Sequence, residues 1–133
     1  MEVYDAAVGN HDDDLNATFY QQSPLPSGLL RTGVSDERIL QAVADSHMVG
    51  ITSIFTDQET MVLETTKLIK HAYPDKLVIC GGVNSRSRIE RFLDAGVDVV
   101  CLSEAEHTIQ EIAAEVGRGA RDFSKLAAVA FRA

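Results

Sequence analysis

The chain has 133 residues, a net charge of −8 and a hydrophobic fraction of 45%. This length predicts one domain with its own core, and the acidic balance argues against nucleic acid or an anionic membrane surface as a partner. No apolar run approaches the ~20 residues of a membrane span, and we expect no secretory signal. With only two cysteines, Cys80 and Cys101, a reduced, cytoplasmic setting is favoured.

The first 34 residues have the composition of a short strand and a long loop. Residues 3–8 are rich enough in apolar residues to predict a leading strand. Residues 9–34 contain Asp12, Asp13 and Asp14 and two of the three prolines, which is loop chemistry over a length that compact domains seldom carry. We therefore expect residues 1–34 to be a strand with a mobile loop, and residues 35–133 to form an α/β domain.

Strands and helices alternate along the rest of the chain. Ser35 is the expected N-cap of the first helix, Pro74 ends the second, and Gly96 ends the third. After the leading strand, strands are expected at 48–55, 77–80, 97–102 and 126–131, and helices at 35–45, 57–73, 86–95 and 103–117. Alternation at this spacing predicts a parallel sheet with right-handed crossovers.

Gly81 and Gly82 follow the strand at 77–80, whose unbroken apolar run indicates burial on both faces. Glycine permits positive φ and a close approach to the backbone, and Asn84 or Ser85 is expected to cap the helix that follows. Ligands of open α/β sheets bind at this edge, so we expect a ligand seat at 81–85. The alternative, that the glycines only make a tight turn, stays open.

Other strand ends carry small and hydroxyl residues, which would leave room for a broad, flat ligand. No P-loop, dinucleotide fingerprint or Ser-His-Asp order is present, and no catalytic residue or metal ligand is expected. The four histidines share no spacing and are predicted to lie on the surface; they are His11, His47, His71 and His107. Glu104 and Glu106 are interpreted as helix-start acids rather than an acid–base pair.

Five segments taken together, in order, resemble a known module. They are residues 33–39, Val49-Gly50-Ile51-Thr52-Ser53, Pro74, residues 78–82 with Gly81-Gly82, and Asp98-Val99-Val100 leading to Ser103-Glu104-Ala105-Glu106. The set, over residues 33–131, is similar to the cobalamin-binding domain at the N-terminus of cobalamin-dependent radical-SAM enzymes. The resemblance implies a flavodoxin-like (Rossmann-like) parallel sheet of about five strands with helices on both faces.

The resemblance also implies the ligand, cobalamin, bound over the strand ends without a histidine lower ligand. Thr52 and Ser53 would meet the corrin or its tail, and Gly81 and Gly82 would line a groove for the nucleotide tail. The implied cofactor-binding residues are Thr52, Ser53, Phe55, Thr56, Gly81, Gly82, Val83, Asn84, Ser103, Glu104, Ala105 and Glu106. The implied partner is a radical-SAM domain, which would carry the iron–sulfur cluster and S-adenosylmethionine of a methyltransferase or related enzyme.

Ser103 and Ala105 stand where the family has glycines, and the family's first strand would precede Met1. We therefore expect an incomplete sheet open to self-association, and cobalamin binding that is weaker than micromolar or lost. The radical-SAM cysteine triplet does not occur in the sequence, so this chain alone is expected to be non-catalytic. The alternative is a fragment of a phosphate-binding β/α enzyme, which the turn at Gly81-Gly82 and residues 95–100 also resemble.

Overall fold

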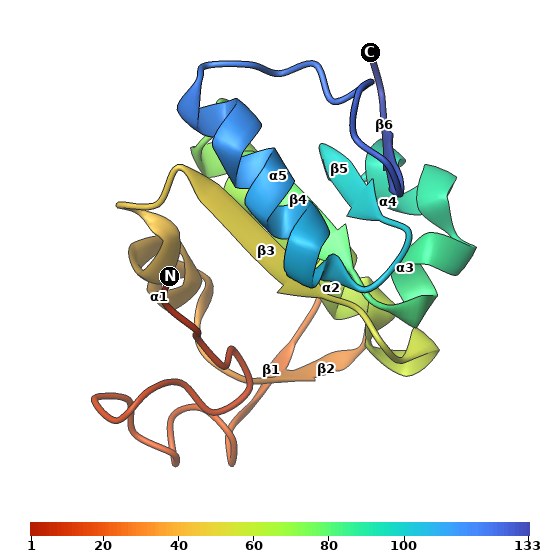
Figure 1. The fold of residues 1–133 in the computed structure, drawn as a ribbon. Coiled ribbons are helices and arrows are strands. Elements are labelled where there is room, and N and C mark those ends of the chain that lie inside the picture. The colour runs from red at the N-terminus through yellow and green to blue at the C-terminus, as the bar shows by residue number, and fades with distance from the viewer. The chain divides into compact units, whose positions relative to one another are not determined.

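The computed structural model describes residues 1–133 and consists of two compact units, Met1–Asp45 and Ser46–Ala133 (Figure 1). The first unit contains a short hairpin and a helix. The second contains the main sheet and the remaining helices. The expected boundary after residue 34 stays a prediction.

The first unit is built from β1 (Gln22–Pro24), β2 (Leu30–Thr32) and α1 (Asp36–Val43). Strands β1 and β2 pair antiparallel within the segment expected to be a loop. The predicted cap of α1 is confirmed, because Ser35 Oγ accepts a hydrogen bond from the Arg38 N–H at 3.2 Å.

The leading strand expected at residues 3–8 is absent, so that prediction is wrong. Asp5 competes with strand pairing: its side chain accepts from the Ala7 N–H at 2.9 Å, and its carbonyl oxygen accepts from the Gly9 N–H at 2.7 Å. Such local side-chain bonding favours a turn over an extended strand.

Asp13 joins distant parts of the first unit. Its carboxylate accepts from the Arg38 Nε–H at 2.7 Å, from the Tyr4 hydroxyl at 3.1 Å and from the Asn10 N–H at 2.9 Å. The Arg38 guanidinium also lies 5.2 Å from the centroid of the Tyr4 ring. These bonds, led by the one from Arg38, lower the pKa of Asp13 to about 2.

The second unit has a four-stranded sheet in the order β3-β4-β5-β6. Its strands are β3 (Met48–Thr52), β4 (Leu77–Gly81), β5 (Val99–Cys101) and β6 (Val129–Phe131). β3, β4 and β5 are parallel, as expected, whereas β6 is antiparallel to β5. The sheet therefore has four strands rather than about five, and it is not wholly parallel. β3 pairs within it only with β4; self-association through β3 stays a prediction.

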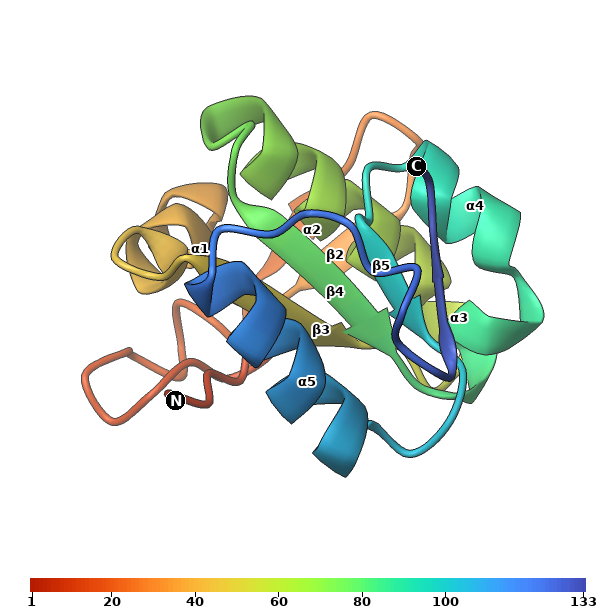
Figure 2. The same ribbon diagram turned by 45° about the horizontal axis from the view of Figure 1, so that its top comes forward.

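Helices cover both faces of this sheet, with α5 on one face and α2 on the other (Figures 1 and 2). The helical segments are η1 (Thr56–Gln58), α2 (Glu59–Ala72), α3 (Val83–Ser87), α4 (Ile89–Asp94) and α5 (Ala105–Gly117). None of them has the length and apolar character that crossing a bilayer requires.

The core follows the alternation of side chains along β4 and β5. Leu77 and Ile79 pack with Ile112 of α5 and with Phe123. Val78 and Cys80 are completely buried and point to the opposite face, because successive strand residues alternate. The predicted burial of β4 on both faces is thus confirmed.

Candidate functional site

The carboxyl ends of β3, β4 and β5 lie at one edge of the sheet, because these three strands are parallel. The Ser53 N–H donates to the Gly81 carbonyl oxygen at 2.8 Å and extends the pairing of β3 and β4 one residue further. The segments that follow each strand start at Ser53, Gly82 and Leu102. Most of the residues predicted to bind a cofactor lie on these segments.

Three large apolar side chains are exposed at this edge. Ile54 is 51% exposed, Phe55 is 62% exposed and Val83 is 57% exposed. They follow two neighbouring strands, β3 and β4, rather than being scattered. Exposed apolar side chains that lie close together are typical of interaction surfaces, so this edge is a candidate site.

Gly81 and Gly82 have different surroundings although they are adjacent. A side chain at Gly81 would meet no atom within 4 Å, so the backbone there faces open space. A side chain at Gly82, whose φ is +106°, would collide with the Ser53 carbonyl oxygen. Gly82 is therefore required by the fold itself, while Gly81 leaves room for a ligand.

Gly50 extends this open space along β3. It lies two residues before Thr52, whose register partner is Gly81, so all three residues are on the sheet face that α5 covers. The nearest atom to a side chain at Gly50 would be Ile109 Cδ1 of α5, 4.0 Å away, and both Gly50 and Thr52 are exposed. Gly50 and Ile54 were not among the predicted site residues. The sequence did carry a signal for Gly50, because a glycine inside a strand often marks a close approach of another group to the backbone.

Ser53 and Asn84 are buried beneath the edge rather than exposed on it. The Asn84 side-chain amide donates to Ser53 Oγ at 3.0 Å and to Glu59 Oε2 at 3.1 Å. The expected capping role of Asn84 or Ser85 is wrong, because α3 begins at Val83 with Gly82 as its N-cap. Ser85 Oγ instead donates back to the Gly82 carbonyl oxygen at 3.0 Å.

The third part of the edge follows β5. Ser103, Glu104 and Glu106 are exposed and Ala105 is half-buried. Glu104 is the N-cap residue of α5 but makes no side-chain capping bond. Phe55 and Thr56 are likewise exposed, at the start of η1. The edge thus presents apolar, hydroxyl and carboxylate groups side by side.

Cys80 and Cys101 are buried free thiols on opposite faces of the sheet. Cys80 is in register with Val100, so Cys101 points the other way. Burial raises the pKa of Cys80 to about 11 and raises the pKa of Cys101 as well. All four histidines are exposed, as predicted. No three His, Cys, Asp or Glu side chains form a group that could hold a metal ion.

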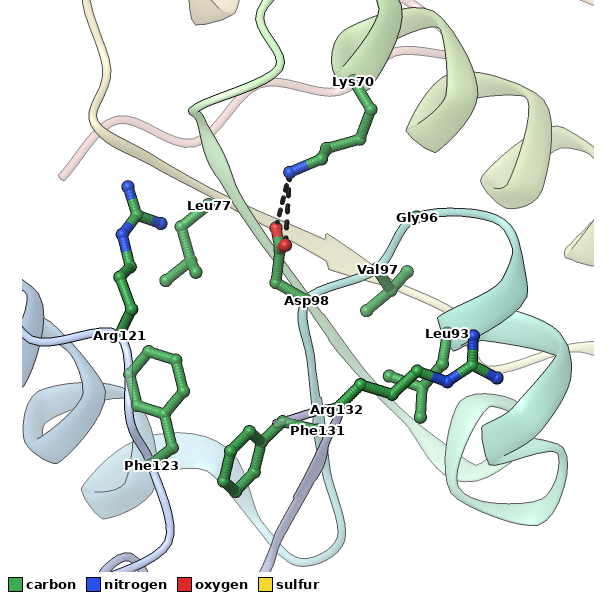
Figure 3. Close-up of a pocket in the computed structure, with 10 residues that line it drawn as sticks. All are labelled: Lys70, Leu77, Leu93, Gly96, Val97, Asp98, Arg121, Phe123, Phe131 and Arg132. Carbon is green, nitrogen blue, oxygen red and sulfur yellow. Dashed lines mark hydrogen bonds and ion pairs between the residues drawn. The ribbon is translucent and has the colours of Figure 1, made fainter.

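A hollow of about 440 Å³ lies at the other end of the sheet, where β4 and β5 begin (Figure 3). Phe123 and Phe131 form an edge-to-face pair along it, with ring centroids 5.7 Å apart. Its charged side chains are already engaged within the chain, in the contacts of Lys70 with Asp98, Arg121 with the Asp75 carbonyl oxygen, and Arg132 with Glu90 and Asp94. The open edge at Gly81 is therefore the stronger candidate site.

The fold and this edge define an α/β domain with an apolar, glycine-bordered surface at the ends of parallel strands. Comparison with protein families identifies it further: residues 20–113 match the model of the B12 binding domain. The chain belongs to the B12-binding domain family. No curated protein and no solved structure matches it.

Proposed function

We propose that this chain holds cobalamin over the carboxyl ends of β3, β4 and β5. The observation that carries the proposal is that exposed Phe55 and Val83 lie at the same edge as the open space above Gly81. A corrin ring is broad and flat, and an exposed apolar surface bordered by a few polar groups suits such a ligand. The family membership of residues 20–113 supports the same ligand.

The nucleotide tail is assigned to the space between β3, β4 and α5. Gly50 and Gly81 contribute no side chain there, and the exposed Thr52 can offer its hydroxyl to the tail. This open backbone is the structural feature that fits the tail. Ser103 and Ala105 add side chains on the β5 side, where they would narrow the approach of the ring.

The proposed work of the chain's own residues is to bind and orient the cofactor. Bound cobalamin would supply its cobalt centre for group transfer, and no residue of this chain is assigned a chemical step. The parent protein is proposed to be a radical-SAM enzyme, with methyl transfer or a related reaction as its activity. Reading the gene beyond the codon for Ala133 tests this part: three cysteines in the order Cys-x-x-x-Cys-x-x-Cys are expected, and their absence would contradict it.

The alternative function, that of a fragment of a phosphate-binding β/α enzyme, is less well supported. Barrels of that type have only parallel strands, with helices on the outer face alone. Here β6 is antiparallel, and α2 and α5 lie on opposite faces of the sheet. The exposed apolar side chains at Ile54 and Phe55 also favour an apolar ligand over phosphate.

Equilibrium dialysis of the 133-residue chain against cyanocobalamin tests the binding proposal. Saturable binding weaker than micromolar is expected, and cobinamide, which lacks the nucleotide tail, should bind less well. Gly81→Val should weaken cyanocobalamin binding roughly tenfold, or about 1.4 kcal/mol, because it fills the tail space.

Gly117→Val is the matched control, since a side chain there also meets no atom within 4 Å but lies at the end of α5. It should leave the dissociation constant unchanged. No saturable binding by the unmodified chain, or equal effects of the two valine variants, would contradict the proposal.

A further inference from the structure

Glu59 is a buried carboxylate below the proposed cobalamin edge. It is the first residue of α2 and is 3% exposed. Its Oε1 lies 2.6 Å from Arg91 Nε and 3.2 Å from Arg88 Nη1, and its Oε2 accepts from the Asn84 amide at 3.1 Å. A buried charge is retained only when it is paired in this way.

Asn84 links this carboxylate to both sides of the edge. Its side-chain amide donates to Ser53 Oγ as well as to Glu59, and its backbone N–H donates to the Ser53 carbonyl oxygen at 3.2 Å. The connected side chains therefore run from α2 through the turn after β4 to the residue after β3. Ile54 and Val83, the exposed residues next to Ser53 and Asn84, are carried by these same two segments.

The contacts of Glu59 suit a residue that holds its neighbours in place rather than one that takes part in a chemical step. The Glu59 carboxylate is enclosed and fully occupied by donors, so a ligand at the edge does not reach it. The two arginines are about half exposed, which weakens their attraction through solvent screening. The Asn84 amide, by contrast, is buried, and removing its charged acceptor would leave it with a weaker bond in a dry environment.

We propose that Glu59 is a positioning residue for the cobalamin edge: through Asn84 it fixes the spacing between Ser53 and the turn after β4, which is Gly82 with the first residues of α3. This inference deepens the proposed function and rests on it for its effect on affinity. The mechanical part, that Glu59 holds the turn, can be measured without any ligand.

The test compares Glu59→Gln with Glu64→Gln. Glu64 lies on the same helix but is exposed and pairs only with Lys67. Amide hydrogen exchange is followed by NMR at Asn84 and at Ile79 in the centre of β4. Glu59→Gln should speed exchange at Asn84 about tenfold while Ile79 is unchanged, and should weaken cyanocobalamin binding by a similar factor. Glu64→Gln should change neither.

If Glu59 only stabilises the fold in general, Glu59→Gln will speed exchange at Ile79 and Asn84 together, and that result overturns the proposal. Unchanged exchange at Asn84, or unchanged affinity in a chain that binds cyanocobalamin, overturns it too. If the unmodified chain binds no cobalamin, the proposed function fails, and the exchange data still decide whether Glu59 holds the turn.

Glu59→Asp covers the case in which Glu59→Gln does not fold, because it keeps the buried carboxylate but shortens the side chain by one methylene and so loosens its contact with the Asn84 amide. A smaller acceleration confined to the turn is then expected at Asn84. No acceleration there would overturn the proposal.

Discussion

Gly82 lies directly against the carbonyl oxygen of Ser53, so close that any side chain at Gly82 would collide with it. The positive φ of Gly82 adds a second reason for glycine. Gly82→Ala should therefore lower the free energy of unfolding by at least about 2 kcal/mol. Gly81→Ala should change it by less than about 1 kcal/mol, since a side chain there meets open space. Urea unfolding of both variants checks this, and equal losses would contradict the different roles assigned to the two glycines.

The stability of the first unit should depend on pH through Asp13. Its pKa is lowered in the folded chain to about 2, chiefly by the hydrogen bonds from Arg38, while an unfolded aspartate titrates near ~4. A lowered folded pKa gives stability that is present above pH ~4 and is lost as the pH falls through about 2. The carboxyl carbon shift of Asp13 in an NMR titration measures the pKa directly.

Asp13→Asn should remove that acid-sensitive step, while Asp12→Asn should leave it in place because Asp12 is exposed. A midpoint for Asp13 near the unfolded value would contradict the contacts with Arg38 and Tyr4.

The two cysteines should be unreactive in the folded chain. Burial raises the pKa of Cys80 to about 11, so at pH 8 its thiol stays protonated, and the thiolate is the reactive form. Burial raises the pKa of the Cys101 thiol as well. A colorimetric thiol reagent should label neither cysteine at pH 8 without denaturant and both in concentrated urea. Fast labelling of the folded chain would contradict their burial.

Phe123 should contribute strongly to the second unit, because it is 2% exposed and packs with Ile112 and Phe131. Phe123→Ala should lower the free energy of unfolding by about 3–5 kcal/mol. Phe19→Ala is the matched control, since Phe19 is half exposed, and it should cost less than about 1 kcal/mol. Chemical denaturation measures both variants; similar losses would mean that residues 118–128 do not pack on the sheet as described.

The repeating part of the fold could be predicted from local pattern. The unbroken apolar run of β4 indicated a strand buried on both faces. Ser35 caps the start of α1, and Gly96 follows the end of α4 with a positive φ, as their chemistry predicts. The direction of β6 could not be predicted, because a short apolar run is the same in a parallel and an antiparallel strand. The hairpin of β1 and β2 was missed because Pro24 argues against a strand.

The position of the candidate site could be predicted from the sequence, but not which of its residues are buried and which are exposed. Strand ends with small and hydroxyl residues pointed to the edge at which the structure leaves open space above Gly81 and exposes Ile54, Phe55 and Val83. The burial of Ser53 and Asn84 was not visible in the sequence, because the acceptor of the Asn84 amide, Glu59, lies 25 residues away. The exposure of Ile54 depends in the same way on where the chain turns after β3.

NMR mapping of cyanocobalamin on the ¹⁵N-labelled chain tests the central claim most directly. The account predicts that added cyanocobalamin shifts the backbone amides of residues 50–56, 81–85 and 103–106. Lys70, Asp98 and Arg121, which line the hollow at the opposite end of the sheet, should not respond. Shifts confined to that hollow, or no shifts at cyanocobalamin concentrations in the millimolar range, would contradict the assignment of the cobalamin site to the carboxyl edge.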